Sequence, residues 1–178
     1  RVDRRYVEGI VDRSLLRLGV ETLDQVQFYW WNFEVGEWLE AVRRLADLQR
    51  AGKVRHIGAT NFTASEIGTM EREVGIKVVS EQVQYSALDH RPEAGLADHC
   101  IGTGTRLLCY GALAGGFLTD TWRAMNEPGG PPGNRSLTKY RLIIEEFGGW
   151  EAYQALLGEL SAIGQEKGVS AAAVALRY

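Results

Sequence analysis

The sequence predicts an α/β protein with a parallel sheet, built as a partial TIM (β/α)8 barrel of about four consecutive βα units. Two observations support this fold class. Short segments rich in β-branched and aromatic residues alternate along the chain with longer amphipathic segments, which is the order of elements in βα units. The chain has 178 residues, whereas a complete eight-fold barrel needs about 250. We therefore expect a single domain over residues 1–178.

Apolar spacing and capping signals predict the helices. In the first amphipathic segment, Val7 and Val11 fall on one apolar stripe, and Gly19 supplies a C-terminal stop. Thr63 and Glu66 have the spacing of a capping box, which starts a later helix. The helices predicted in this way cover residues 4–20, 37–52, 63–75, 96–104, 149–168 and 170–178.

Runs of β-forming residues between these helices predict the strands of the sheet, at residues 24–31, 53–62, 77–86 and 106–113. After the last of them comes a long segment, residues 119–141, that holds all but one of the prolines. We expect a loop there within the single domain. A loop of this length in a compact domain is usually a lid or a binding segment.

Composition excludes several classes of function. A net charge of −3 argues against nucleic-acid binding, which needs a clustered basic excess. No apolar run is long enough to cross a membrane, and no signal-peptide pattern opens the chain. The two cysteines, Cys100 and Cys109, are too few for a disulfide scaffold and lack metal-ligand spacing. We expect a cytoplasmic protein without a metal.

Neutral polar and aromatic residues gather where the predicted strands end, which is where parallel α/β folds place their active sites. Glu81 is the one carboxylate among them, too few for a metal site, and no lysine is present for Schiff-base chemistry. Hydroxyl and amide side chains suit an uncharged planar amide as ligand. The residues at these strand ends are Tyr29, Trp30, Trp31, Asn32, Thr60, Asn61, Glu81, Gln82, Gln84, Tyr85 and Tyr110.

These features together predict half of a nicotinamide dinucleotide site. Tyr110 offers a ring face for stacking, and Gly115 and Gly116 allow close approach of the backbone to a phosphate. Each residue alone has a simpler interpretation. Tyr110 is then a half-buried strand-end aromatic, Asn61 a turn or cap residue, and the two glycines serve a tight turn. The agreement between strand ends favours the cofactor site.

Three segments resemble, in order and spacing, the aldo-keto reductases, which are NADP(H)-dependent (β/α)8 barrels. They are "AGKVRHIGATNF" (51–62), "SEQVQYSALDHRPE" (80–93) and "LLCYGALAGGFLT" (107–119). The segments "RSLTKYR", "GGW" and "GVSAAAVALRY" resemble one subgroup of that family. The resemblance therefore extends over essentially the whole chain.

The resemblance implies roles for the matching residues. Thr60, Asn61 and Gln82 stand at the positions that hold the nicotinamide carboxamide, and Tyr110 stands at the aromatic that stacks on the nicotinamide ring. Leu113 and Gly115 correspond to the loop beside the cofactor's pyrophosphate. Trp30 and Trp31 would line the pocket of a small-molecule carbonyl substrate beside the nicotinamide.

Two departures from the family pattern bear on catalysis. The family's catalytic Asp, Tyr and Lys belong to strands that would precede Arg1, and the strand that binds the adenosine 2′-phosphate would follow Tyr178. The family's catalytic His is replaced by Tyr29. A phenol donates a hydrogen bond to a carbonyl oxygen but, unlike imidazole, does not titrate near neutral pH. The chain thus resembles the middle portion of the family's barrel.

The expected function is NADPH-dependent reduction of an aldehyde or ketone, or the reverse alcohol oxidation, with this chain carrying the nicotinamide half-site. Two alternatives remain open: a cofactor-binding pseudoenzyme or regulatory protein, and a truncated fragment without function. A half-barrel exposes two strand edges. Two copies that pair these edges would form a homodimer.

Overall fold

The computed structural model describes residues 4–129 and 133–178. The chain divides into two compact units. The first comprises Arg1–Val83 and Gly95–Leu108, and the second comprises Gln84–Ala94 and Cys109–Tyr178. Within the described residues, no helix combines the length and apolar character that a membrane span requires.

The sheet and its helices confirm the predicted α/β class. Its strands follow the order β1-β2-β3-β4, and the β1–β2 and β2–β3 pairs are parallel. The strands are β1 (Leu23–Tyr29), β2 (Val54–Thr60), β3 (Val78–Gln84) and β4 (Arg106–Tyr110). The helices between and before them are α1 (Arg4–Leu18), α2 (Trp38–Arg50), α3 (Ala64–Val74) and α4 (Leu96–Thr103). Each of these elements lies at a position that the sequence predicted. The strands also form the parallel sheet expected of a partial barrel.

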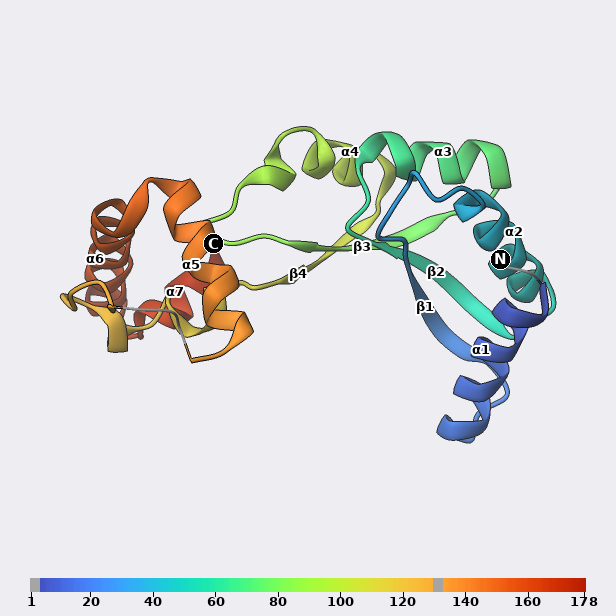
Figure 1. Cartoon of the computed structure of the whole chain (residues 1–178), viewed down its shortest axis with the longest axis horizontal. Coiled ribbons are helices and arrows are strands. Elements are labelled where there is room, and N and C mark those ends of the chain that lie inside the picture. The colour runs from blue at the N-terminus through green and yellow to red at the C-terminus, as the bar shows by residue number, and fades with distance from the viewer. Residues whose placement is uncertain (1–3, 130–132) are drawn as a thin grey trace. The chain divides into compact units, whose positions relative to one another are not determined.

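One face of the sheet is apolar and is covered by helices (Figure 1). Phe28 of β1, Ile57 of β2 and Val78 of β3 are buried in the core of the first unit. Against them pack side chains of α2 and α3, including Val42, Leu45, Ala46, Ile67 and Met70. Removal of this apolar surface from water stabilises the layer of helices on the sheet.

The opposite face of the same sheet is polar. Gln25 and Gln27 of β1 both donate to the hydroxyl oxygen of Ser80 on β3, at 2.8 and 3.0 Å. Gly58 of β2 lies between them, and a Cβ there would come within 2.0 Å of the Gln27 side-chain oxygen and 2.4 Å of the Ser80 hydroxyl. Because only glycine leaves room, the amide and hydroxyl groups meet across the middle strand.

A shift of register in β3 decides which of its side chains reach the polar face. Ile57 pairs with Val78 whereas Ala59 pairs with Glu81, so β3 uses three residues where β2 uses two. An extra residue in one strand reverses the alternation of side chains beyond it. Glu81 therefore lies on the helix-covered side, and Gln82, which pairs with Thr60, lies on the polar side.

The capping box predicted at Thr63 is present at the start of α3. The Thr63 hydroxyl accepts from the Glu66 N–H at 3.3 Å, and the Glu66 carboxylate accepts from the Thr63 N–H at 2.7 Å. Two N–H groups that a helix start leaves without partners are thereby satisfied. The helix begins directly after the loop that carries Asn61.

The second unit is helical and has its own core. Its elements are the short 3-10 helices η1 (Arg91–Glu93), η2 (Ala114–Gly116) and η3 (Asp120–Trp122) and the helices α5 (Arg135–Phe147), α6 (Gly149–Lys167) and α7 (Ala171–Arg177). Tyr153 is fully buried, and its hydroxyl donates to the Phe117 carbonyl at 2.7 Å. That bond satisfies the phenol inside an apolar cluster.

Helix α5 starts inside the segment predicted as the loop 119–141. The Asn134 side chain accepts from the Leu137 N–H at 2.9 Å and caps the helix, which begins at Arg135. Tyr140, Ile143 and Ile144 then form a buried stripe at helical spacing. The loop is therefore shorter at its C-terminal end than predicted, and residues 130–132 of it lie outside the described residues.

Substitution of Thr63 by alanine removes the hydroxyl half of the capping box. We expect Thr63→Ala to lower the free energy of unfolding by about 1 kcal/mol, the usual loss for a helix N-cap. Urea denaturation followed by circular dichroism measures it. Ser65→Ala, an exposed position in the same first turn, is the control and should change stability little; equal losses for both variants would contradict the role of the cap.

Candidate functional site

Three of the predicted site residues form a row across the C-terminal ends of β1, β2 and β3. Tyr29 pairs with Thr60, and Thr60 pairs with Gln82. Neighbouring strands lie about 4.8 Å apart, so these residues are immediate neighbours. Residues two apart in a strand share a face, which puts Tyr29 on the polar side with Gln25 and Gln27. The sheet thus brings together residues that are far apart in the sequence.

Asn61 extends this row by one residue beyond the end of β2. Its N–H donates to the Gln82 carbonyl at 3.0 Å, so the strand pairing continues past Thr60. Its backbone has φ 60, in the left-handed region. Asparagine tolerates this conformation better than most residues because its short polar side chain bonds locally. Asn61 and Gln82, two of the three predicted carboxamide ligands, are therefore joined by a backbone hydrogen bond.

Glu81 lies beneath this row, on the helix-covered side of the sheet. Its side chain is fully buried. One carboxyl oxygen accepts from the Phe62 N–H at 2.8 Å, and the other has no hydrogen-bond partner within residues 4–129 and 133–178. Burial raises the pKa of Glu81 to about 7, opposed by the backbone N–H groups of Phe62 and Asn61 and reinforced by Glu66.

The sequence pattern did not identify Glu81 as the acceptor of the Phe62 N–H. It indicated Glu81 only as a single carboxylate, too few for a metal site. A carboxylate inside a strand of β-branched residues is the signal that was available. Among the described residues, no group of three or more His, Cys, Asp and Glu side chains lies close enough to hold a metal ion.

Trp30 points away from the row of Tyr29, Thr60 and Gln82. It stacks on Phe28, with ring centroids 6.1 Å apart, and its indole N–H donates to the carbonyls of Asn32 at 2.9 Å and Val35 at 3.1 Å. Since Phe28 belongs to the core under the helices, Trp30 belongs to that side as well.

Trp31 and Trp30 both border a groove along the free edge of β1. Trp31 is 79% exposed. The groove has a volume of about 410 Å³ and is lined mainly by apolar side chains of α1, β1 and α2, among them Tyr6, Ile10, Val26, Phe28 and Leu45. The role of both tryptophans in a substrate pocket stays a prediction.

Tyr110, Leu113 and Gly115 belong to the second unit: Tyr110 is the last residue of β4, and Leu113 and Gly115 lie in the turn that follows it. The Tyr140 side chain of α5 packs against this turn: a Cβ at Gly115 would meet its ring at 2.6 Å, and a Cβ at Gly111 would meet its hydroxyl at 2.6 Å and its ring at 3.0 Å. Both glycines have positive φ, 65 and 71 respectively. The turn therefore needs glycine at both positions for its backbone angles and for the space that Tyr140 occupies.

Lys139 is a second residue near Tyr110 that the sequence did not single out. Its ammonium lies 4.8 Å from the Tyr110 ring centroid and 5.1 Å from that of Tyr140, which is cation–π geometry. Burial, followed by repulsion from Arg91, lowers the pKa of Lys139. Gln84, at the end of β3, is buried and bonds to Asp89 at 2.6 Å, so its amide has a structural partner.

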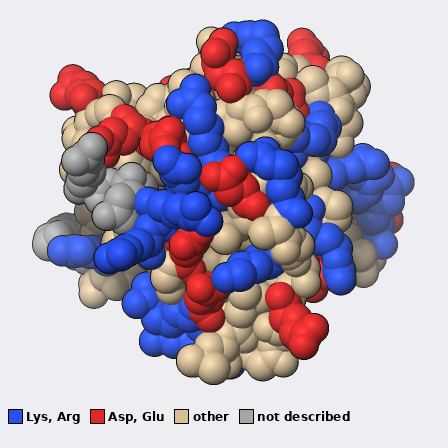
Figure 2. Space-filling model, turned by 90° about the vertical axis from the view of Figure 1, so that its right-hand side faces the viewer, with Lys and Arg blue, Asp and Glu red and all other residues tan. Residues whose placement is uncertain are grey.

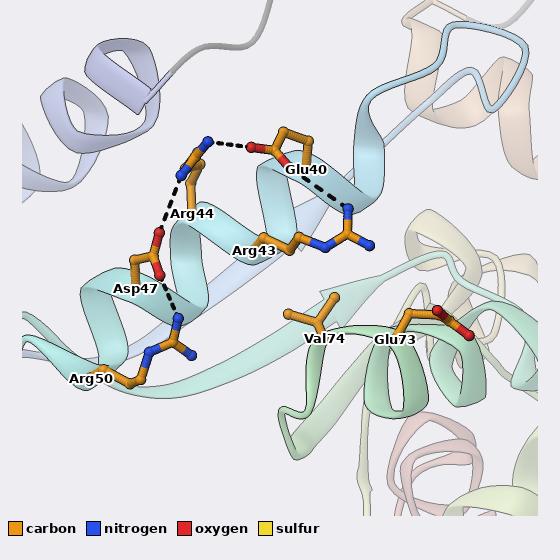
Figure 3. Close-up of a pocket in the computed structure, with 7 residues that line it drawn as sticks. All are labelled: Glu40, Arg43, Arg44, Asp47, Arg50, Glu73 and Val74. Atoms are coloured by element: carbon orange, nitrogen blue, oxygen red, sulfur yellow. Dashed lines mark hydrogen bonds and ion pairs between the residues drawn. The ribbon is translucent and has the colours of Figure 1, made fainter.

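A second depression lies between α2 and α3 (Figure 3). It has a volume of about 340 Å³. Its three arginines and three carboxylates are Arg43, Arg44, Arg50, Glu40, Asp47 and Glu73. Ion pairs run from Arg43 and Arg44 to Glu40 and from Arg44 and Arg50 to Asp47. The lining therefore carries equal numbers of positive and negative side chains, with no excess of either sign.

Charges of both signs also mix over the wider surface around these helices. Figure 2 shows Lys and Arg side chains lying among Asp and Glu side chains on this side of the molecule. A surface of this kind produces no strong field of one sign. The row at the strand ends is therefore the better candidate site in the first unit.

Comparison with known proteins finds similarity to aldo-keto reductases. A family model described as the aldo/keto reductase family matches residues 1–178. The chain is similar to the aldo-keto reductase yakc of Schizosaccharomyces pombe, whose name carries NADP(+), with 30% identity over 128 residues, 68% of this chain and 36% of that protein. It is also similar to 2,5-diketo-D-gluconic acid reductase B of a Corynebacterium species, with 39% identity over 101 residues, 57% of this chain and 36% of that protein.

A solved structure shows the same arrangement of elements. The glycerol dehydrogenase of Gluconobacter oxydans superimposes with a TM-score of 0.78 at 26% identity, covering 96% of this chain and 50% of that chain. The chain thus spans about half, or less, of the length of the relatives that it matches.

The raised pKa of Glu81 predicts how stability changes with pH. A carboxyl whose pKa rises on folding, here from 4.5 to about 7, stabilises the fold below the lower value, and that contribution is lost as pH rises through the higher one. We expect Glu81→Gln to have a higher free energy of unfolding than wild type at pH 8. The difference between variant and wild type should be about 1–3 kcal/mol larger at pH 8 than at pH 5.

Urea denaturation at the two pH values measures this difference. Glu73→Gln, an exposed carboxyl at the end of α3, serves as the control and should give no such change. The same difference between Glu81→Gln and wild type at both pH values would show that Glu81 does not titrate in this range.

Proposed function

Because the chain belongs to the aldo/keto reductase family, we propose that it carries the nicotinamide-binding half-site of an NADP(H)-dependent oxidoreductase. The reaction is reduction of an aldehyde or ketone, or the reverse oxidation of an alcohol. The observation that carries this proposal is the row of Tyr29, Thr60 and Gln82, which Asn61 extends. The substrate is a small carbonyl compound.

The donor and acceptor groups of the row suit the nicotinamide carboxamide. A planar amide needs donors for its carbonyl oxygen and acceptors for its NH₂ group. Thr60 offers a hydroxyl, and Asn61 and Gln82 each offer both halves of an amide. All three side chains are neutral, which matches the uncharged carboxamide. In this proposal these residues orient the nicotinamide ring, and bound NADPH supplies the hydride.

On the family resemblance, Tyr110 and the glycine turn that follows it are also proposed to bind the cofactor. Tyr110 stacks its ring on the nicotinamide, and the backbone near Leu113 and Gly115 runs beside the pyrophosphate. The packing of Tyr140 against Gly111 and Gly115 supports this role, because a rigid turn presents its N–H groups to an anion at low entropic cost.

Tyr29 occupies the position next to the reacting carbonyl in this proposal. A phenol donates a hydrogen bond to a carbonyl oxygen and polarises it, whereas proton transfer near neutral pH needs another group. This substitution of the family's histidine also favours a second candidate function, a cofactor-binding protein without turnover. Saturable NADPH binding with no NADPH oxidation across a panel of aldehydes and ketones would select the second candidate.

We also propose that the protein is cytoplasmic. Cys100 and Cys109 are both free thiols, one buried and one exposed. A reducing compartment keeps such thiols reduced.

Titration with NADPH, followed by quenching of the five tryptophans, tests the half-site. We expect saturable quenching by the wild type and a Kd about three- to tenfold higher for Gln82→Ala, the effect of one lost hydrogen bond. Gln25→Ala removes the same side chain from the same face of the sheet, at the N-terminal part of β1, and should bind like wild type. No quenching by folded protein would contradict the proposed function.

We further propose that two copies of the chain pair through the free edge of β1. In the described part of the chain, β1 pairs with β2 alone, and an unpaired edge is a template for strand addition. We expect sedimentation equilibrium to give twice the monomer mass of 19.8 kDa. A mass of one monomer over the whole range of protein concentration would contradict the homodimer.

A further inference from the structure

We propose that Glu81 is a positioning residue of the half-site: its carboxyl group holds the backbone at Phe62 and so keeps Asn61 in the left-handed conformation next to Gln82. This inference rests on the proposed function, since it assigns to Glu81 an effect on cofactor affinity. Glu81 itself lies on the other side of the sheet from the row and does not contact the cofactor.

Two consecutive N–H groups attach the loop after β2 to two consecutive residues of β3. Asn61 donates to the Gln82 carbonyl at 3.0 Å, and Phe62 donates to the Glu81 carboxyl at 2.8 Å. The first bond continues the pairing of the strands, and the second needs a side chain that reaches back from β3. Together they determine the direction of the backbone on both sides of the Asn61 side chain.

The Phe62 ring adds a third attachment on the helix-covered side. Phe62 is 2% exposed. Its ring centroid lies 5.6 Å from that of Phe28, 5.3 Å from Phe33 and 5.9 Å from Trp38. Both the ring and the N–H of Phe62 are thus held in place. Asn61, in the left-handed conformation, then connects β2 to the capped start of α3 at Thr63.

The layer around Glu81 is poorly suited to a carboxyl group, which argues that its hydrogen bond matters. Glu81 is fully buried, and one of its oxygens has no partner among the described residues. An apolar side chain of similar volume would avoid this desolvation. It would also leave the Phe62 N–H without an acceptor, and the loop would then be held by the Asn61 bond and the ring alone.

The surroundings of Glu81 make this function dependent on pH. The titratable groups near it are the Glu66 carboxylate of α3, which raises the pKa of Glu81, and the Cys100 thiol of α4, whose pKa Glu81 raises. Its partner across the sheet, Ala59, carries no charge. With the pKa of Glu81 at about 7, acidification removes the charge and weakens the bond from Phe62.

Two variants separate the hydrogen bond from the charge. Glu81→Gln keeps an oxygen acceptor for the Phe62 N–H without a charge, and Glu81→Leu has similar bulk without an acceptor. The Kd of NADP⁺ is measured for both and for wild type at pH 6 and pH 8. At pH 8 we expect about a tenfold higher Kd for Glu81→Leu, and about a two- to fivefold higher Kd for Glu81→Gln, which keeps the acceptor but lacks the charge.

The change of Kd with pH distinguishes this role from a purely structural one, which would not make the affinity depend on the charge of Glu81. On going from pH 8 to pH 6, the Kd of wild type should rise more than that of Glu81→Gln, by about two- to fivefold. The comparison of the two proteins cancels titration of the phosphates of NADP⁺ itself. Equal affinities of wild type and folded Glu81→Leu would overturn the inference.

A measurement without cofactor separates this inference from the proposed function. In ¹H–¹⁵N NMR spectra, the Phe62 amide should titrate with a midpoint near 7 in wild type and not in Glu81→Gln. Its exchange with solvent should become faster in Glu81→Leu. An unchanged Phe62 amide in both variants would also overturn the inference. Failure of wild type to bind NADP⁺ would instead reject the cofactor site, while these spectra still decide whether Glu81 holds the loop.

Discussion

The pairing of β2 with β3, including its one-residue shift of register, is the constraint on which the rest of the first unit depends. Without the shift, the alternation along β3 would turn Gln82 toward the helices and Glu81 toward the polar face. The extra residue therefore places a neutral amide in the row with Thr60 and a carboxyl in the core below it. Irregularities of this kind are frequent next to functional sites, where they redirect a side chain.

The two faces of the sheet carry different kinds of side chain. The helix-covered face buries apolar side chains such as Phe28 and Ile57 and holds the layer together. The polar face offers amides and hydroxyls. Among them, Gln25 and Gln27 already donate hydrogen bonds to the Ser80 hydroxyl. Glu81 connects the faces, because its carboxyl group, buried in the apolar layer, accepts from the Phe62 N–H next to Asn61, which extends the row on the polar face. Burial of this carboxyl group reduces the stability of the fold as it ionises near neutral pH.

Sequence patterns predicted most of the elements and the residues of the row, because periodicity, the Thr63–Glu66 capping box and the ends of strands are local signals. They did not predict which way Trp30 faces, since that depends on the register of a strand with its neighbours. Nor did they predict the left-handed Asn61, the acceptor role of Glu81, or α5, whose cap at Asn134 follows a segment rich in proline and glycine. These features arise from contacts between residues distant in sequence, or from a helix signal masked by its neighbours.

The chemistry of the row limits what this part of the chain contributes to a reaction. Thr60, Asn61 and Gln82 carry no titratable side chain, and the phenol of Tyr29 is a hydrogen-bond donor. The carboxyl that titrates near neutral pH, Glu81, is fully buried on the opposite side of the sheet. In the proposed function, the row orients a planar amide and polarises a carbonyl, and a group outside the row supplies the proton of the reaction. Precise orientation is itself a large part of catalysis when the hydride comes from a cofactor.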